Sequence, residues 1–183
     1  MSERYLLDAN AVIPLQRTGQ LDALVAIGAK LQLLVVEEVY DELCEPRGGK
    51  LSREAAEMRR ALDGNVTLAS IEPESAASAR FDALKARKRG GIKSNLGEAA
   101  SVAWAADHDD VVFVTRDAAA AFLALNELGS RVTTFFQLIR EAVELGALAP
   151  SKARLIGDTC SVTSGVEADP PLWWNEWLVS KSS

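Results

Sequence analysis

Short apolar runs alternate with longer amphipathic stretches along this chain. The apolar runs have the length of strands and lie at Tyr5–Leu7, Leu31–Val36 and Val111–Thr115, and we expect further strands at the alternating segment Val66–Ile71 and at Arg131–Thr134. Apolar runs of this length that end at charged or turn-forming residues predict strands buried inside a sheet. The run Val111–Thr115 is the strongest of them, because valine and phenylalanine are enriched in strands.

Segments with helical spacing separate these strands. We expect Asn10 to be the N-cap of a first helix that has Pro14 in its first turn, followed by a second helix over Leu21–Ala29. Further helices are predicted over Glu37–Glu45, Arg53–Leu62 with Ser52 as its cap, Glu74–Arg87, Asn95–Asp107, Ala118–Leu128, Phe135–Leu145 and Ser151–Ile156.

Alternating strands and helices predict an α/β fold with three layers, α/β/α, around a mostly parallel sheet of four or five strands. The length of 183 residues favours one domain, which we place at residues 1–148, followed by a C-terminal helix and a tryptophan-rich extension over residues 149–183. Functional groups of such sheets collect beyond the carboxyl ends of the strands. Asp8 and Asp117 both follow a strand at such a position.

The amino-acid composition limits the cellular location and the kinds of catalytic site that we expect. Hydrophobic residues make up 48% and charged residues 25%, no apolar run is long enough for a membrane span, and no signal peptide is evident, so we expect a cytoplasmic protein without membrane contact. Cys44 and Cys160 are far apart and are expected to be buried thiols. Since His108 is the single histidine, zinc sites and serine hydrolases are disfavoured, and hydrolytic chemistry would rest on carboxylates.

Four acids are candidates for such chemistry, and each has a structural alternative. Asp8 follows an aliphatic strand, where a buried charge is costly unless a cation pairs with it, but it could also only help to start a helix. Asp117 could be the N-cap of the next helix. Glu98 stands three residues after Asn95, the spacing of a capping box. Glu42 borders an apolar stripe and could point inward, or it could belong to a solvated acidic face.

One basic stretch contrasts with the net charge of -6. It runs from residue 85 to residue 93 and contains no acid; its five cations are Lys85, Arg87, Lys88, Arg89 and Lys93. A solvated helix end and loop would explain it, and so would a surface that contacts phosphates. Because the whole chain is acidic, a polyanionic substrate would need cations as mediators.

The order of these segments resembles the PIN-domain family. Four segments carry the resemblance: Leu6-Leu-Asp-Ala-Asn10, Val35-Val-Glu-Glu-Val-Tyr-Asp-Glu-Leu43, Gly97-Glu-Ala99 and Val114-Thr-Arg-Asp117. The catalytic acids of the family fall on Asp8, Glu42, Glu98 and Asp117, and its hydroxyl or amide positions fall on Asn10 and Thr115. The similarity covers Tyr5 to Phe136, and Ala118–Ala121 lacks the further acid that some relatives carry there.

This resemblance implies an endoribonuclease that hydrolyses RNA phosphodiester bonds with Mg²⁺ or Mn²⁺, the hard cations that prefer oxygen ligands. Asp8, Glu98 and Asp117 would be ligands, Glu42 an outer ligand or water orienter, and the basic stretch an RNA contact. Many prokaryotic relatives are toxins of toxin–antitoxin pairs and dimerise, so an antitoxin protein and a second copy are the partners that the resemblance implies.

Other readings compete with a nuclease. A phosphatase of the haloacid-dehalogenase type would need a second aspartate where this chain has Asn10. A catalytically silent PIN-like binding or scaffold protein would keep the fold and cleave nothing. The tail Asp169–Trp177 holds three of the four tryptophans, which either pack on the chain's own surface or form a docking surface for a partner.

Overall fold

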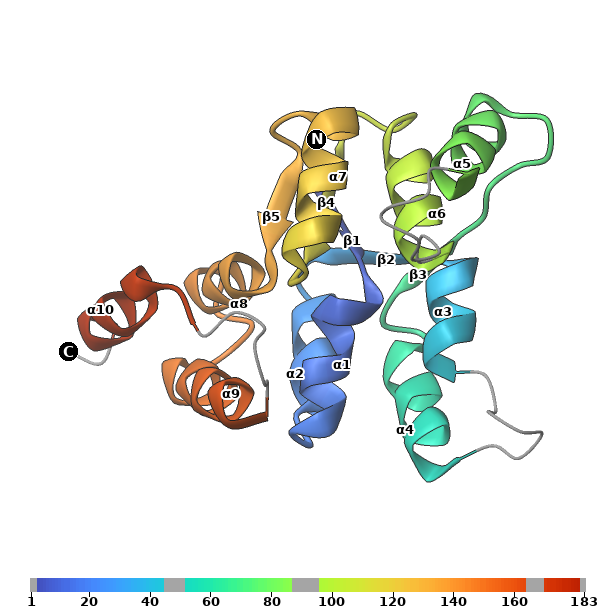
Figure 1. Cartoon of the computed structure of the whole chain (residues 1–183). Helices are drawn as coiled ribbons and strands as arrows, with labels where there is room; N and C mark the ends of the chain where they lie inside the picture. Colours follow the sequence, from blue (N-terminus) through green and yellow to red (C-terminus); the bar gives the residue numbers. More distant parts are fainter. Residues whose placement is uncertain (1–2, 45–51, 87–95, 164–169, 182–183) are drawn as a thin grey trace.

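The computed structural model describes residues 3–44, 52–86, 96–163 and 170–181. Its strands are β1 (Arg4–Leu7), β2 (Gln32–Val36), β3 (Thr67–Ala69), β4 (Val111–Thr115) and β5 (Val132–Thr134). Its helices are α1 (Ala9–Arg17), α2 (Leu21–Gly28), α3 (Glu37–Cys44), α4 (Arg53–Leu62), α5 (Ala76–Ala86), α6 (Leu96–Ala105), α7 (Ala118–Leu128), α8 (Phe135–Glu144), α9 (Pro150–Thr163) and α10 (Leu172–Ser180) (Figure 1).

The five strands form one sheet in the order β3-β2-β1-β4-β5, and every pair is parallel. The predicted α/β class and the sheet of four or five strands are confirmed. From β1 the chain first builds β2 and β3 on one side and then crosses to β4 and β5 on the other side. The strand order therefore reverses between β1 and β4, and α/β sheets often place functional groups beyond the carboxyl ends of the strands at such a point.

Helices cover both faces of the sheet. Successive side chains of a strand point to opposite faces. In β1, the Arg4 guanidinium lies 5.7 Å from the ring centroid of Trp104 in α6, while the Tyr5 hydroxyl donates a hydrogen bond of 2.6 Å to Glu141 in α8. Helix α6 therefore covers one face and α8 the other. Burial on both faces explains why β1 and β4 are almost entirely apolar.

The start of the first helix differs from the sequence prediction. Asp8, in an extended conformation, occupies the N-cap position, and Asn10 already lies inside α1. Pro14 consequently lies beyond the first turn, in the helix interior. The expected N-cap at Asn10 is wrong because the chain enters the helix directly from β1 with no intervening loop. The predicted cap of α4 is confirmed, since the Ser52 hydroxyl accepts a 3.0 Å hydrogen bond from the Ala55 N–H.

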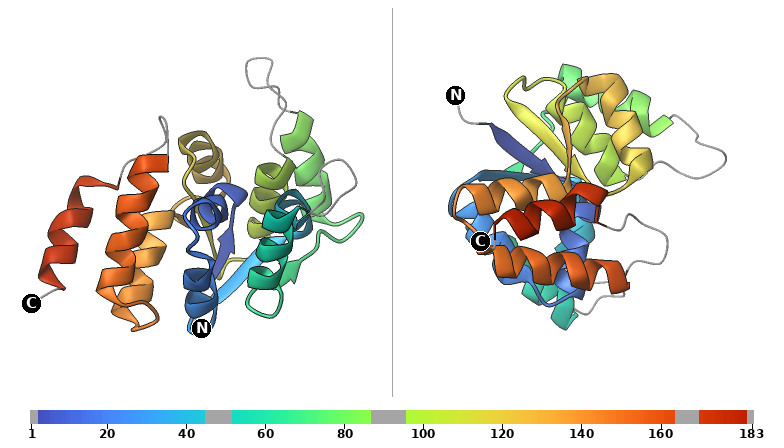
Figure 2. Two further views of the ribbon diagram at one scale, coloured as in Figure 1. Left: turned by 90° about the horizontal axis from the view of Figure 1, so that it is seen from below. Right: turned by 90° about the vertical axis from the view of Figure 1, so that its left-hand side faces the viewer.

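The C-terminal segment packs on its own chain. Helices α8, α9 and α10 lie side by side at one end of the molecule (Figure 2). Trp174 is 1% exposed, Trp177 is also buried, and Trp173 is half-buried. Of the two alternatives for the tryptophan-rich tail, the structure shows packing against the chain itself. The predicted boundary after residue 148 stays a prediction.

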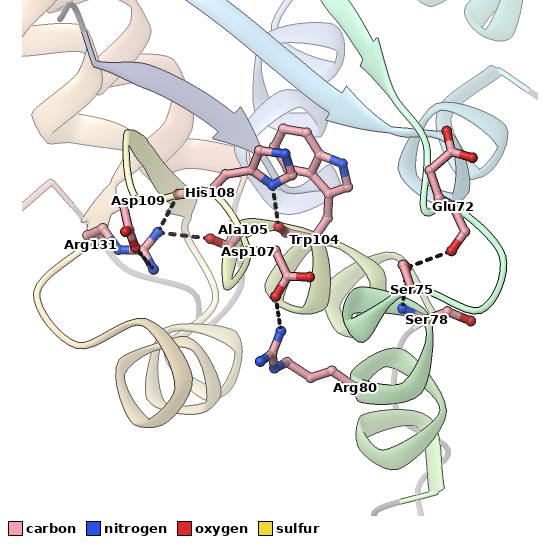
Figure 3. A network of polar contacts seen from close by, with 10 residues as sticks. All are labelled: Glu72, Ser75, Ser78, Arg80, Trp104, Ala105, Asp107, His108, Asp109 and Arg131. Atoms are coloured by element: carbon pink, nitrogen blue, oxygen red, sulfur yellow. Dashed lines mark hydrogen bonds and ion pairs between the residues drawn. The ribbon is translucent and has the colours of Figure 1, made fainter.

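Polar contacts join residues near the amino ends of the strands, at the side of the sheet opposite Asp8. The rings of Trp104 and His108 stack at a centroid distance of 3.7 Å, and Arg80 pairs with Asp107 at 2.6 Å (Figure 3). Arg131 Nη1 donates to the carbonyl oxygens of Ala105, His108 and Val111 at 2.8 to 3.0 Å. One guanidinium thus ties the loop between α6 and β4 to β5.

Replacing Arg131 by Met should lower the free energy of unfolding by about 2–3 kcal/mol, because hydrogen bonds from a charged donor are strong and the carbonyls lose their partner. Urea denaturation measures the change. Arg53 pairs with Glu57 on an exposed helix surface, so Arg53→Met is the matched control and should leave the midpoint unchanged. Equal midpoints for wild type and Arg131→Met would contradict this role.

Two further expectations concern the whole chain. Both cysteines are free and buried, as predicted. Burial raises the pKa of the Cys44 thiol to about 11 and also raises that of Cys160. Among the described residues, no helix combines the length and the apolar composition that crossing a bilayer requires.

Candidate carboxylate site

Asp8 lies at the carboxyl end of β1, where the strand order reverses. Its backbone N–H donates to the carbonyl of Val114 in β4 at 3.0 Å, which extends the pairing of the two strands by one residue. The side chain is 0% exposed. Although Asp8 occupies the N-cap position of α1, its carboxylate makes no capping hydrogen bond. The position agrees with the alternative that Asp8 helps to start α1, because the amino end of a helix favours negative charge, and it is compatible with a second role.

The two carboxylate oxygens of Asp8 have different surroundings. Oδ2 accepts a 2.9 Å hydrogen bond from the Thr115 hydroxyl. Oδ1 is buried and accepts no hydrogen bond of normal geometry from the described residues. A buried acceptor without a partner carries a desolvation cost, and for an ionised carboxylate that cost is large. Oδ1 is therefore the atom at which a proton or a cation would be bound.

Burial raises the pKa of Asp8 above its ordinary value of 3.8. The Thr115 hydroxyl, the Ala9 backbone N–H and the Asn10 side chain act in the opposite direction, because each favours the charged form. The negative charge of nearby Asp117 adds to the upward shift. Asn10 thus favours the charged form of Asp8 although it does not cap the helix, and its supporting role in a site stays a prediction.

This raised pKa predicts a pH-dependent stability that Asp8→Asn removes. The folded protein holds the Asp8 proton more tightly than the unfolded chain, so stability falls as the pH rises from 3.8 to the raised pKa. The substituted amide carries no charge, and in buffer free of divalent ions the variant should gain stability over wild type across this window. Urea unfolding from about pH 4 to about pH 8 measures the difference. A difference that does not change with pH would contradict the buried charge.

Asp117 lies beside Asp8 at the end of the neighbouring strand. Its Oδ1 accepts hydrogen bonds from the N–H groups of Ala119 and Ala120 at 2.7 and 2.8 Å, so Asp117 is the N-cap of α7. The structural alternative for Asp117 is therefore confirmed, and it is compatible with a second role. The amino end of α7 also favours negative charge here.

Thr115 connects the two acids. Its hydroxyl donates to Asp8 Oδ2 and accepts a 3.1 Å hydrogen bond from the Asp117 N–H. The side chain is buried, and both of these groups are fixed by the ends of β1 and β4. The supporting role expected for Thr115 thus has a defined geometry, because one hydroxyl orients the carboxylate of Asp8 and the backbone of Asp117.

The other two acids lie on separate helices. Glu98 is half-buried in the first turn of α6, the helix that packs against β1, β2 and β4. Its capping-box partner Asn95 lies outside the described residues. Glu42 is exposed, which agrees with the alternative of a solvated face and not with an inward orientation. The expected roles of Glu42 and Glu98 in the carboxylate site stay predictions.

Glu42 lines a cavity of about 460 Å³ between α1, α3 and α4. Ile13, Gln16 and Arg17 line the side formed by α1. No motif in the sequence singled out these positions. Their spacing of three and four residues, which places them on one helix face, is the signal that could have grouped them.

Of the five cations in the basic stretch, Lys85 alone lies among the described residues. Its ammonium group pairs with Asp82 at 3.0 Å and lies 4.9 Å from the ring centroid of Phe81. Arg87, Lys88, Arg89 and Lys93 lie outside the described residues. The expected phosphate contact of this stretch stays a prediction.

The site fits a hard cation through its pair of carboxylates. Within the described ranges, no three His, Cys, Asp or Glu side chains form a group that could hold a metal ion. Convergence of three acids stays a prediction, and the charge of Asp117 is near enough to act on Asp8. Mg²⁺ is often bound by one or two carboxylates together with water and substrate phosphates, and the unpartnered Asp8 Oδ1 is a suitable oxygen ligand.

The fold and this pair of acids define an α/β protein with a candidate carboxylate site at the point where the strand order reverses. Comparisons with family models, with curated proteins and with solved structures give no match to this chain.

Proposed function

We propose that this chain is a metal-dependent endoribonuclease of the PIN type. The observation that carries the proposal is the fully buried carboxylate of Asp8, whose Oδ1 has no hydrogen-bond partner among the described residues and on which the charge of Asp117 acts. Its position at the carboxyl ends of two adjacent parallel strands is where α/β proteins place their functional groups. The order of the motifs in the sequence, which resembles the PIN family, supplies the reaction type.

The residues of the chain have distinct parts in this proposal. Asp8 and Asp117 would hold Mg²⁺ or Mn²⁺, with Glu98 as a further direct or water-mediated ligand. Thr115 orients Asp8 through Oδ2, which leaves Oδ1 for the ion. Asn10 favours the charged form of Asp8, and Glu42 would orient water from α3. The bound ion would supply water activation and neutralise charge on the phosphate.

RNA is the proposed substrate, and positive charge must meet it locally because the chain as a whole carries a net charge of -6. Lys85, Arg87, Lys88, Arg89 and Lys93 are the candidate phosphate contacts, since they precede Glu98 in the sequence. A cation at Asp8 and Asp117 would itself lower the repulsion between this site and a polyanion.

A binding protein of the same fold that cleaves nothing is the second candidate. The observation that favours it is that the described acids form a pair and no group of three. Such a protein would keep the sheet and the Asp8–Thr115 hydrogen bond but would lack a ligand set sufficient for hydrolysis.

A cleavage assay with the full chain separates the candidates. The protein is freed of metal with EDTA, incubated with a mixture of single-stranded and structured RNAs, and titrated with Mg²⁺ or Mn²⁺, while calorimetry follows ion binding. The nuclease requires cleavage that depends on the ion. Ion binding without cleavage would favour the silent protein. The absence of both ion binding and cleavage would overturn the proposed site.

A further inference from the structure

Arg116 links the carboxylate site to the C-terminal end of the fold. It stands between Thr115, which holds Asp8, and Asp117, which caps α7. Its half-buried side chain turns toward α8, where the guanidinium lies 5.8 Å from the ring centroid of Phe136. The positive charge of Arg116 also acts on the thiol of Cys160 in α9. The backbone between Thr115 and Asp117 is thus held by a contact of the Arg116 side chain with α8.

Phe136 is in turn held by α10. Its ring meets that of Trp174 edge to face, with centroids 5.1 Å apart and an interplanar angle of 66°. Trp174 is the most deeply buried residue of α10, and it reaches α9 at Gly157. A Cβ atom at Gly157 would lie 2.4 Å from Trp174 Nε1, so the close approach of the two helices requires glycine at this position.

These contacts form one series from α10 to the site. Trp174 packs on Phe136, Phe136 packs under Arg116, and Arg116 shares its backbone with the segment that positions both acids. Edge-to-face aromatic pairs and guanidinium–aromatic contacts are both directional, so each fixes the orientation of its neighbour as well as filling space.

We propose that α10 is a positioning element for the carboxylate site, with Trp174 acting through Phe136 and Arg116 on the Thr115–Asp117 segment. The contacts themselves do not depend on the proposed function. Only their effect on ion binding and catalysis rests on the proposed function. Leu172, on the same helix, is the comparison, because its side chain is 97% exposed.

Amide hydrogen exchange of the full chain, in buffer free of divalent ions, tests this proposal. The N–H groups of Ala119 and Ala120 report the Asp117 cap, and the N–H of Phe113 in β4 reports global unfolding. Relative to Phe113, the two alanine amides should exchange about tenfold faster in Trp174→Ala, as expected for a local opening. Trp174→Phe should restore most of the protection, and Leu172→Ala should leave the exchange unchanged.

Unchanged relative exchange in Trp174→Ala, or equal acceleration in Leu172→Ala, would overturn the proposal. If Trp174→Ala does not fold, Gly157→Ala replaces it, since the added Cβ would clash with the Trp174 ring and displace it from its position against α9. This variant must show the same acceleration, and its absence in the folded variant would again overturn the proposal.

A second readout connects the series to the proposed function. Calorimetric titration with Mn²⁺ should give a dissociation constant about tenfold higher for Trp174→Ala than for wild type, the lower end of the effects of outer-shell changes. Absence of Mn²⁺ binding to the wild type would refute the proposed metal site, while the exchange result would still decide the role of α10.

Discussion

Asp8→Asn should abolish the ion-dependent cleavage of RNA, with a loss of roughly a thousandfold or more, while the chain stays folded. The amide keeps an oxygen to accept the Thr115 hydrogen bond but replaces the charged Oδ1 with a group that does not bind cations. Without divalent ions the variant should be more stable than wild type near neutral pH, because a buried charge has been removed. Cleavage rates and urea midpoints measure both effects.

The opposite signs of these two effects make the test specific. A residue needed only for folding would lose activity and stability together. Asp158→Asn removes the same charge from an exposed position on α9 and should change neither quantity. If Asp8→Asn retained cleavage at the wild-type rate, Asp8 would have no part in the reaction.

Thr115→Val should weaken Mn²⁺ binding by about 10- to 100-fold, the usual effect of removing a group that orients a metal ligand. The substitution keeps the shape of the side chain but deletes the hydrogen bond to Asp8 Oδ2 and the one from the Asp117 N–H. Without its donor, the buried Asp8 carboxylate should be harder to ionise, so the ion must displace a more tightly held proton. Calorimetric titration at fixed pH measures the affinity.

Thr115→Ser is the matched control, because it keeps the hydroxyl and loses only a methyl group. Its Mn²⁺ affinity should stay close to that of wild type. Equal affinities for the valine variant and wild type would show that the hydroxyl does not orient Asp8 for ion binding.

Much of the sheet could be predicted from the sequence because parallel strands buried on both faces are continuous apolar runs. Val111–Thr115 was predicted with the bounds that β4 has. The edge strands were less certain: the predicted Val66–Ile71 is longer than β3, which pairs only over Thr67–Ala69. Pairing on a single side ends where the neighbouring strand ends, and the sequence of an edge strand does not contain that information.

The candidate site could be predicted only in part. Asp8 and Asp117 were found because each follows a strand, and parallel strands bring such residues to one edge of the sheet. Sequence spacing could not tell that Asp117 caps its helix whereas Asp8 leaves its carboxylate uncapped. That difference arises from the orientation of each side chain after its strand. The link from Arg116 to Trp174 depends on how three C-terminal helices pack, which no local pattern records.

The central claim is that Asp8 and Asp117 together hold a divalent cation through the unpartnered Asp8 Oδ1. Anomalous diffraction from crystals of the full chain soaked in Mn²⁺ tests it most directly. The account predicts a Mn²⁺ peak at about 2 Å from Asp8 Oδ1, on the side of Asp117. An ordered Asp8 carboxylate with no peak beside it at saturating Mn²⁺ would contradict the account.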